Sequence, residues 1–243
     1  MSESLLRACV QVSTFLGGGL LTRASGFLFA RDGRTWLATS AHVVHDEAAG
    51  HLPDRVGVAL HVDDVDLTRT VQVAVPLYAN GVALWRQASD TGGQVDVAVV
   101  PLDAAALASS RGWEAFGPEH LEGALEQVEV GEPALVVGFP LGFHDTVHHL
   151  PVVRQAGIAS AFGVRFQGQG YFLTDARTHR GTSGAPVVVR ARSGPLAASR
   201  LPWRLLGVHA SRMDMGTRDR DLDESLGLNA AWYADVLLAL TRP

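Results

Sequence analysis

Disulfide chemistry is missing from this sequence, because Cys9 is its only cysteine and no internal bridge can form. A small scaffold held together by several disulfides is therefore excluded, and the chain suits a reducing compartment. Cys9 lies in an apolar segment near the N-terminus. We expect its thiol to be a small buried apolar group, not a reactive one.

Long apolar runs are also missing. No stretch approaches the roughly 20 apolar residues that a membrane helix needs. The N-terminus has no basic region, carries Glu3, and is interrupted by Gly17, Gly18 and Gly19, so it does not resemble a signal peptide. We expect a soluble cytoplasmic protein without a membrane partner.

No sign of charge dominates. The 25 acidic and 20 basic residues give a formal net charge of −5 and are spread along the chain. This pattern shows no concentration of basic residues that would attract nucleic acid. The predicted partner is a protein or peptide, not a polyanion.

Apolar residues and short β-like segments are abundant. Hydrophobic residues make up 47% of the 243 positions, which is enough for a sizeable core. Asp32-Gly33 between two apolar runs is typical of a tight hairpin turn. Short alternating or β-branched segments separated by turn residues favour an all-β barrel or sandwich; they cover residues 9–15, 25–30, 35–40, 56–62, 70–78, 82–86, 96–102, 134–139, 150–162, 170–175, 185–190 and 204–210.

The pattern divides the chain into four parts. Strand signals fill residues 1–103 and again 133–228, and residues 104–132 lack strand alternation, which indicates a connector. The apolar residues of 230–240 suit a helix packed on a core, so 229–243 is predicted to be a C-terminal helix. The outline is two β-modules, a connector and a helix.

Ser183 lies between glycines in Gly181-Thr182-Ser183-Gly184. Flanking glycines allow a sharp turn that brings backbone N–H groups close to a bound carbonyl, as an acyl-transfer nucleophile requires. By itself, such a string is also common in surface loops. The motif alone leaves both readings open.

His42 and Asp96 are the other two candidates. His42 ends a buried apolar run, and an imidazole with a pKa near about 6.5 suits a general base. Asp96 opens the apolar run Asp96-Val97-Ala98-Val99-Val100, where a carboxylate could orient that imidazole. Taken singly, a strand-end histidine and a turn aspartate are ordinary. The chain order His, Asp, Ser matches that of chymotrypsin and differs from subtilisin and the α/β-hydrolases.

The sequence resembles the bacterial trypsin-like peptidases, especially the HtrA-type protease domain and the glutamyl endopeptidases. The resemblance runs through nearly the whole chain and rests on several motifs, which are Ser25-Gly26-Phe27-Leu28-Phe29, Ala38-Thr39-Ser40-Ala41-His42-Val43-Val44, Asp96-Val97-Ala98, Gly138-Phe139-Pro140-Leu141-Gly142 and Gly181-Thr182-Ser183-Gly184. It implies two packed antiparallel β-barrels with a C-terminal helix, the chymotrypsin-like arrangement.

The resemblance also implies a mechanism. His42, Asp96 and Ser183 would form a catalytic triad, with an oxyanion hole from the N–H groups of Gly181 and Ser183, and the activity would be that of a serine endopeptidase. No metal or organic cofactor is required. A catalytically idle or partner-activated protein, which acts by binding a regulatory protein partner, is the alternative.

Specificity is predicted from three further residues. In proteases similar to this one, the residue six before the nucleophile often lies at the base of the specificity pocket, and here it is Arg177, which disfavours cleavage after Lys or Arg. Thr178 and His209 match a threonine and a histidine that bind a carboxylate in glutamyl endopeptidases. The hypothesis is cleavage after Glu, Asp or Gln; alternatively, Thr178 and His209 merely satisfy each other.

Two other motifs are not assigned to metal binding. The segment 144–149 contains three histidines, but fixed ligand partners elsewhere in the sequence are not evident. The segment 219–223 resembles a calcium loop, yet Glu224 stands where glycine is required. We expect a polar loop in the first case and no calcium site in the second.

Overall fold

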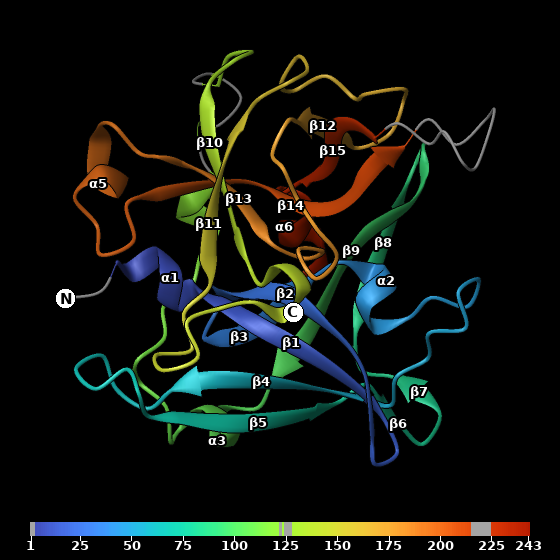
Figure 1. The fold of residues 1–243 in the computed structure, drawn as a ribbon, viewed down its shortest axis with the longest axis vertical. Coiled ribbons are helices and arrows are strands. Elements are labelled where there is room, and N and C mark those ends of the chain that lie inside the picture. The colour runs from blue at the N-terminus through green and yellow to red at the C-terminus, as the bar shows by residue number, and fades with distance from the viewer. Residues whose placement is uncertain (1–2, 122, 124–127, 215–224) are drawn as a thin grey trace.

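A computed structural model describes residues 3–121, 123, 128–214 and 225–243, and most of its strands form two large antiparallel sheets packed against each other (Figure 1). The predicted all-β fold of two β-barrels with a C-terminal helix is confirmed. The first sheet ends at Leu102 and the second begins at Pro133. The exact division at 1–103, 104–132, 133–228 and 229–243 remains a prediction.

The first sheet has seven strands in the spatial order β5-β4-β1-β2-β3-β9-β8. Its hairpin between β2 and β3 turns at Asp32 and Gly33, whose φ angles of 51° and 74° are those of a tight turn, as predicted. The strands are β1 Cys9–Leu16, β2 Gly19–Arg31, β3 Arg34–Thr39, β4 Arg55–His61, β5 Thr70–Pro76, β8 Arg86–Asp90 and β9 Gly93–Leu102. A small separate hairpin joins β6 Tyr78–Ala79 to β7 Val82–Ala83.

The second sheet has six strands in the order β11-β10-β13-β14-β15-β12. Its long strands β14 and β15 pair over most of their length. The strands are β10 Pro133–Gly138, β11 Val152–Gly157, β12 Tyr171–Thr174, β13 Pro186–Arg190, β14 Trp203–Asp214 and β15 Ser225–Tyr233.

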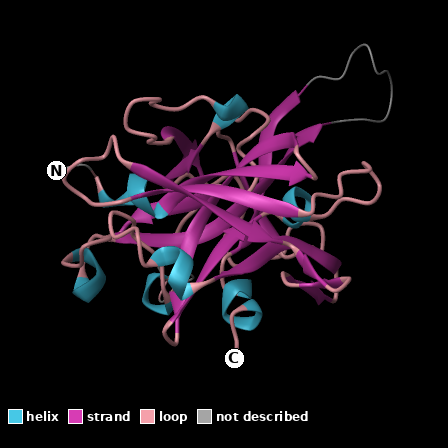
Figure 2. Cartoon of the chain, turned by 90° about the horizontal axis from the view of Figure 1, so that it is seen from below, coloured by secondary structure: helices cyan, strands magenta, loops and turns pink. Residues whose placement is uncertain are grey.

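The helices are short and lie around the periphery of the strands (Figure 2). They are α1 Ser4–Ala8, α2 Ala41–Val44, α3 Ala104–Leu107, α5 Gly194–Ala197 and α6 Val236–Leu240, with single 3-10 turns η1 Pro118–His120 and η2 Pro140–Gly142. None of the helices in the described part of the chain has the length and apolar character of a membrane span.

The predicted C-terminal helix over 229–243 is partly wrong. Residues up to Tyr233 belong to strand β15, and helix α6 begins only at Val236. Ala230 and Ala231 pair with β14 on one side and with β12 on the other, and both are buried. Pairing on both edges inside the sheet outweighs the local preference of an alanine-rich segment for helix.

The apolar core forms three clusters, one inside each sheet and one between the sheets. Strand β9 contributes to two of them, because successive side chains of a strand point to opposite faces. Val97 and Val99 pack in the cluster between the sheets, whereas Ala98 and Val100 pack inside the first sheet. Both faces of β9 are therefore buried, which fixes the strand that carries Asp96.

Candidate active site

Three elements supply His42, Asp96 and Ser183. His42 lies in the one-turn helix α2, directly after β3, and Asp96 lies near the start of β9 in the same sheet. Ser183 lies in the loop between β12 and β13 of the second sheet. The sequence placed His42 at the end of a strand; in the structure β3 ends at Thr39, and a short helical turn then carries the imidazole.

Asp96 holds His42 with both of its carboxylate oxygens. The Nδ1 of His42 lies 2.8 Å from Oδ2, and the backbone N–H of His42 donates to Oδ1 at 3.0 Å. An ionised carboxylate only accepts hydrogen bonds, so the proton on the ring lies at Nδ1. The Nε2 atom is thereby left as the basic nitrogen.

The pKa of His42 lies above its ordinary value. Burial lowers this pKa, but the hydrogen bond from the ring to Asp96 and the negative charges of Asp96 and Asp46 together outweigh the burial. The surroundings therefore stabilise the imidazolium form, which a general base must pass through.

Ser183 donates its hydroxyl hydrogen to the carbonyl oxygen of Ala210, at 3.0 Å. Both Ser183 and His42 are among the described residues, and no hydrogen bond joins their side chains. In free enzymes, catalytic hydrogen bonds often form only in the complex with substrate.

The backbone around Ser183 carries two N–H groups that no described residue accepts from. Gly181 and Gly184 have φ angles of 89° and 86°, which favour glycine, and a Cβ atom on Gly181 would lie 2.7 Å from the carbonyl oxygen of Phe139. Within the described part of the chain, neither the N–H of Gly181 nor that of Ser183 has a hydrogen-bond acceptor. Two such donors beside a nucleophile can hold a developing oxyanion.

A turn of the second sheet holds the peptide that precedes Gly181. The N–H of Leu141 donates to the carbonyl oxygen of Arg180 at 2.6 Å, which directs that carbonyl toward the turn. Leu141 itself has a φ of 54°, and Gly142 follows with 74°. The motif Gly138-Phe139-Pro140-Leu141-Gly142 therefore contacts the segment that precedes Ser183 directly.

The residues predicted to set specificity do not satisfy one another. Thr178 donates to Oδ1 of Asn229 at 2.6 Å, and Asn229 donates in turn to the carbonyl oxygens of Thr174 and Ala176. The alternative in which Thr178 pairs with His209 is therefore wrong. The sequence did not point to Asn229, because this residue lies in the segment 229–243 that was predicted to be helical.

His209 is buried, and its Nδ1 has no hydrogen-bond partner among the described residues. The pKa of His209 is lowered to about 4, mainly by burial and also by the positive charge of His42, against which the negative charge of Asp96 acts. His209 is thus neutral at pH 7 and retains one unsatisfied ring nitrogen.

A cavity of about 300 Å³ lies beside this region. Arg177 and Arg212 are exposed side chains that line it, together with Thr178 and Asn229. Arg177 therefore lies at an open wall of this cavity and not at a buried base. His209 is not among the described residues that line it.

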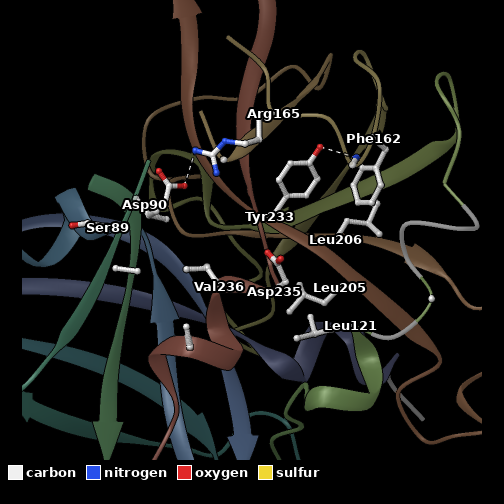
Figure 3. Close-up of a pocket in the computed structure, with 16 residues that line it drawn as sticks. Ser89, Asp90, Leu121, Phe162, Arg165, Leu205, Leu206, Tyr233, Asp235 and Val236 are labelled. Carbon is white, nitrogen blue, oxygen red and sulfur yellow. Dashed lines mark hydrogen bonds and ion pairs between the residues drawn. The ribbon is translucent and has the colours of Figure 1, made fainter. Parts of the chain in front are cut away.

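Another cavity, of about 650 Å³, lies elsewhere. In Figure 3, Phe162 and Tyr233 stand on one side of it and the ion pair of Asp90 with Arg165, 2.8 Å long, on another, and Asp235 points inward from below them. None of His42, Asp96 and Ser183 lines this cavity. Its size is therefore no argument for catalysis.

The histidine-containing segment 144–149 forms local contacts. The ring of His144 bonds the carbonyl of Gly142 at 2.7 Å, and His148 pairs with Asp145 at 2.7 Å. Among the described residues, no group of three or more His, Cys, Asp or Glu side chains could hold a metal ion. The segment 219–223, considered for calcium, lies outside the described residues.

Comparisons with known proteins agree with the fold. Residues 24–194 match a family model described as a trypsin-like peptidase domain, and this range includes His42, Asp96 and Ser183. No curated protein matches the chain.

A solved structure, that of the serine endoprotease from Yersinia pestis, superposes with a TM-score of 0.56 and 16% sequence identity. The match covers 97% of this chain and 62% of that one, so the chain spans less than two thirds of its length. At this identity the similarity concerns the fold alone.

Proposed function

The chain belongs to the trypsin-like peptidase family, and from this we propose that it is a serine endopeptidase with the triad His42, Asp96 and Ser183. The observation that carries the proposal is the double hydrogen bond of Asp96 to His42, which leaves Nε2 as a base. The N–H groups of Gly181 and Ser183, which have no acceptor among the described residues, support it.

The reaction would begin when the Ser183 hydroxyl leaves the carbonyl of Ala210 and donates to Nε2 of His42. Its Oγ attacks the substrate carbonyl, and His42 takes the proton while Asp96 stabilises the imidazolium. The oxyanion is held by the N–H groups of Gly181 and Ser183, each contributing about 3 kcal/mol to lowering the barrier. His42 then protonates the leaving amine, and water hydrolyses the acyl-enzyme by the same steps in reverse. These proposed steps require no metal or organic cofactor.

A labelling experiment tests this proposal. A fluorophosphonate probe reacts covalently with an activated serine, so we expect wild-type protein to be labelled and Ser183→Ala to remain unlabelled. The same substitution should lower kcat toward a peptide substrate by roughly 10⁶-fold. Absence of labelling in folded wild-type protein would contradict the proposal.

The hydrogen bond from Ser183 to Ala210 favours a second candidate. In this alternative the protein is idle or awaits a regulatory protein partner, because its nucleophile is held away from the base. Unlabelled wild-type protein would support the alternative, and the labelling of wild-type protein alone would reject it.

We propose cleavage after Glu, and also after Asp or Gln. The guanidinium groups of Arg177 and Arg212 line the cavity of about 300 Å³ and can bind an acidic side chain there. A peptide-library digest should then show Glu, Asp or Gln before the cut bond. Cleavage after Leu, Ala or Arg without acidic residues would reject this specificity while leaving the peptidase proposal intact.

A further inference from the structure

Ser25 on strand β2 is buried and uses all of its polar groups next to the nucleophile. Its N–H donates to the carbonyl of Ser183 at 2.9 Å, and its hydroxyl donates to the carbonyl of Gly181 at 2.7 Å. The same hydroxyl accepts from the N–H of Phe139 at 2.9 Å, and Thr39 donates to the carbonyl of Ser25 at 2.8 Å. A residue of the first sheet thus binds two carbonyls of the loop that carries the nucleophile of the second.

The peptides on both sides of Gly181 are held by hydrogen bonds, and the hydroxyl of Ser25 takes part in this arrangement. The peptide before Gly181 is fixed through the carbonyl of Arg180, which the Leu141 N–H binds. The peptide after Gly181 is fixed through its own carbonyl, which Ser25 binds. Phe139, two residues before Leu141, donates its N–H to the same hydroxyl. The Ser25 oxygen therefore bonds both the turn that holds the peptide before Gly181 and the carbonyl of the peptide after it.

The surroundings of the Ser25 hydroxyl are closely packed. Ser25 is fully buried, and a Cβ atom on Gly138 would lie 2.5 Å from its Oγ. Removal of the hydroxyl therefore leaves the N–H of Phe139 and the carbonyl of Gly181 without this partner in a buried site.

We infer that Ser25 is a positioning residue that sets the direction of the oxyanion-binding N–H groups, an inference that rests on the proposed peptidase function. It acts through the Gly181 segment and does not touch the substrate. Oxyanion stabilisation depends on donors that are already oriented before the reaction, so a loss of this orientation slows the chemical step more than it weakens substrate binding.

The test compares Ser25→Ala with Thr14→Val. Thr14 is also a buried hydroxyl in the first sheet, but its side-chain hydrogen bonds go only to Thr22. We expect Ser25→Ala to lower both kcat and the rate constant of fluorophosphonate labelling by about 10- to 100-fold, with KM changed by less than about 3-fold. Thr14→Val, measured at the same folded fraction, should keep wild-type kinetics.

A second variant and an inhibitor pair separate positioning from loss of structure. Ser25→Cys retains a weak donor and acceptor at this position and should recover part of the lost rate. A peptide aldehyde, which forms an oxyanion with Ser183, should bind Ser25→Ala about 10-fold or more weakly, while the corresponding alcohol binds as it does to wild type.

The outcomes are distinguishable. Equal rate constants for Ser25→Ala and Thr14→Val, in a wild-type protein that is labelled, would overturn the role of Ser25 alone. So would a rise in KM without a fall in kcat. Wild-type protein that is folded and unlabelled would overturn the proposed function, and this inference with it.

Discussion

The Asp96 carboxylate binds His42 through two hydrogen bonds, and this small arrangement decides both the tautomer and the basicity of the imidazole. Its negative charge keeps the pKa of His42 above the ordinary value despite partial burial. Since a general base must be unprotonated, the pH at which activity disappears reports this interaction.

Asp96→Asn should lower kcat by about 10⁴-fold, because an amide favours the wrong tautomer of His42. In wild-type protein, kcat/KM should fall as the pH drops through a pKa above about 6.5. In the variant this pKa should move downward. The measurement is kcat/KM between about pH 4.5 and 9, and a pH profile that is identical in both proteins would contradict the role of Asp96.

His209→Leu should make the protein more resistant to acid. In the unfolded chain this histidine binds a proton near pH 6.5, whereas the folded form resists protonation until about pH 4, so acid favours unfolding within this window. Wild-type protein should lose roughly 2–4 kcal/mol more unfolding free energy between pH 7 and 4 than the variant does. Urea titrations at both pH values measure this difference, and equal losses would show that His209 is not buried in its neutral form.

The motif residues could be predicted from sequence, but their supporting contacts could not. Short motifs around His42, Asp96 and Ser183 contain the chemistry within a few neighbouring positions. The role of Ser25 depends on contacts with Gly181 and Phe139, which are more than 100 residues away. Such contacts arise from the packing of two sheets and leave no local pattern.

At the level of elements, most strands could be predicted because their alternation is local. The exceptions are β8, which is mostly polar and partly exposed, and β15, whose alanines resemble a helix. In both cases the strand exists because of the neighbouring strands with which it pairs.

Helix α6 is short, yet it packs the end of the chain against the first sheet. Leu237 is fully buried in the cluster between the sheets, and Arg31 and Arg86 donate to the carbonyls of Leu238 and Leu240. The helix therefore closes the region where the two sheets meet.

Leu237→Ala should lower the unfolding free energy by about 3 kcal/mol, because it leaves a cavity in a packed cluster. Leu52→Ala is the matched control, since Leu52 is 43% exposed and should change stability by less than about 0.5 kcal/mol. Urea unfolding of both variants measures the effect. A similar loss for both would mean that α6 does not contribute to the core.

At the level of the whole molecule, the cluster between the sheets joins the two halves. It contains Phe27, Trp36 and Val97 from the first sheet and Val188 and Trp232 from the second. Two hydrogen bonds also join the two halves of the chain, one from Arg165 to Asp90 and one from Gln169 to the carbonyl of Gly92. Neither sheet covers this apolar surface by itself.

The protein should therefore unfold in one cooperative transition. Far-UV circular dichroism, tryptophan fluorescence and the loss of fluorophosphonate labelling should give the same urea midpoint. The physical reason is that exposing the shared cluster removes the stabilisation of both halves together. Two resolved transitions would show that the sheets are independently stable.

His42 and Asp96, the proposed base and its carboxylate, lie on one half of the chain, and Ser183, the proposed nucleophile, lies on the other. Two separately expressed fragments cut within the connector would thus each be inert and would regain catalysis only on reassociation. Turnover by such a split enzyme would serve as a direct readout of proximity between any two proteins fused to its pieces.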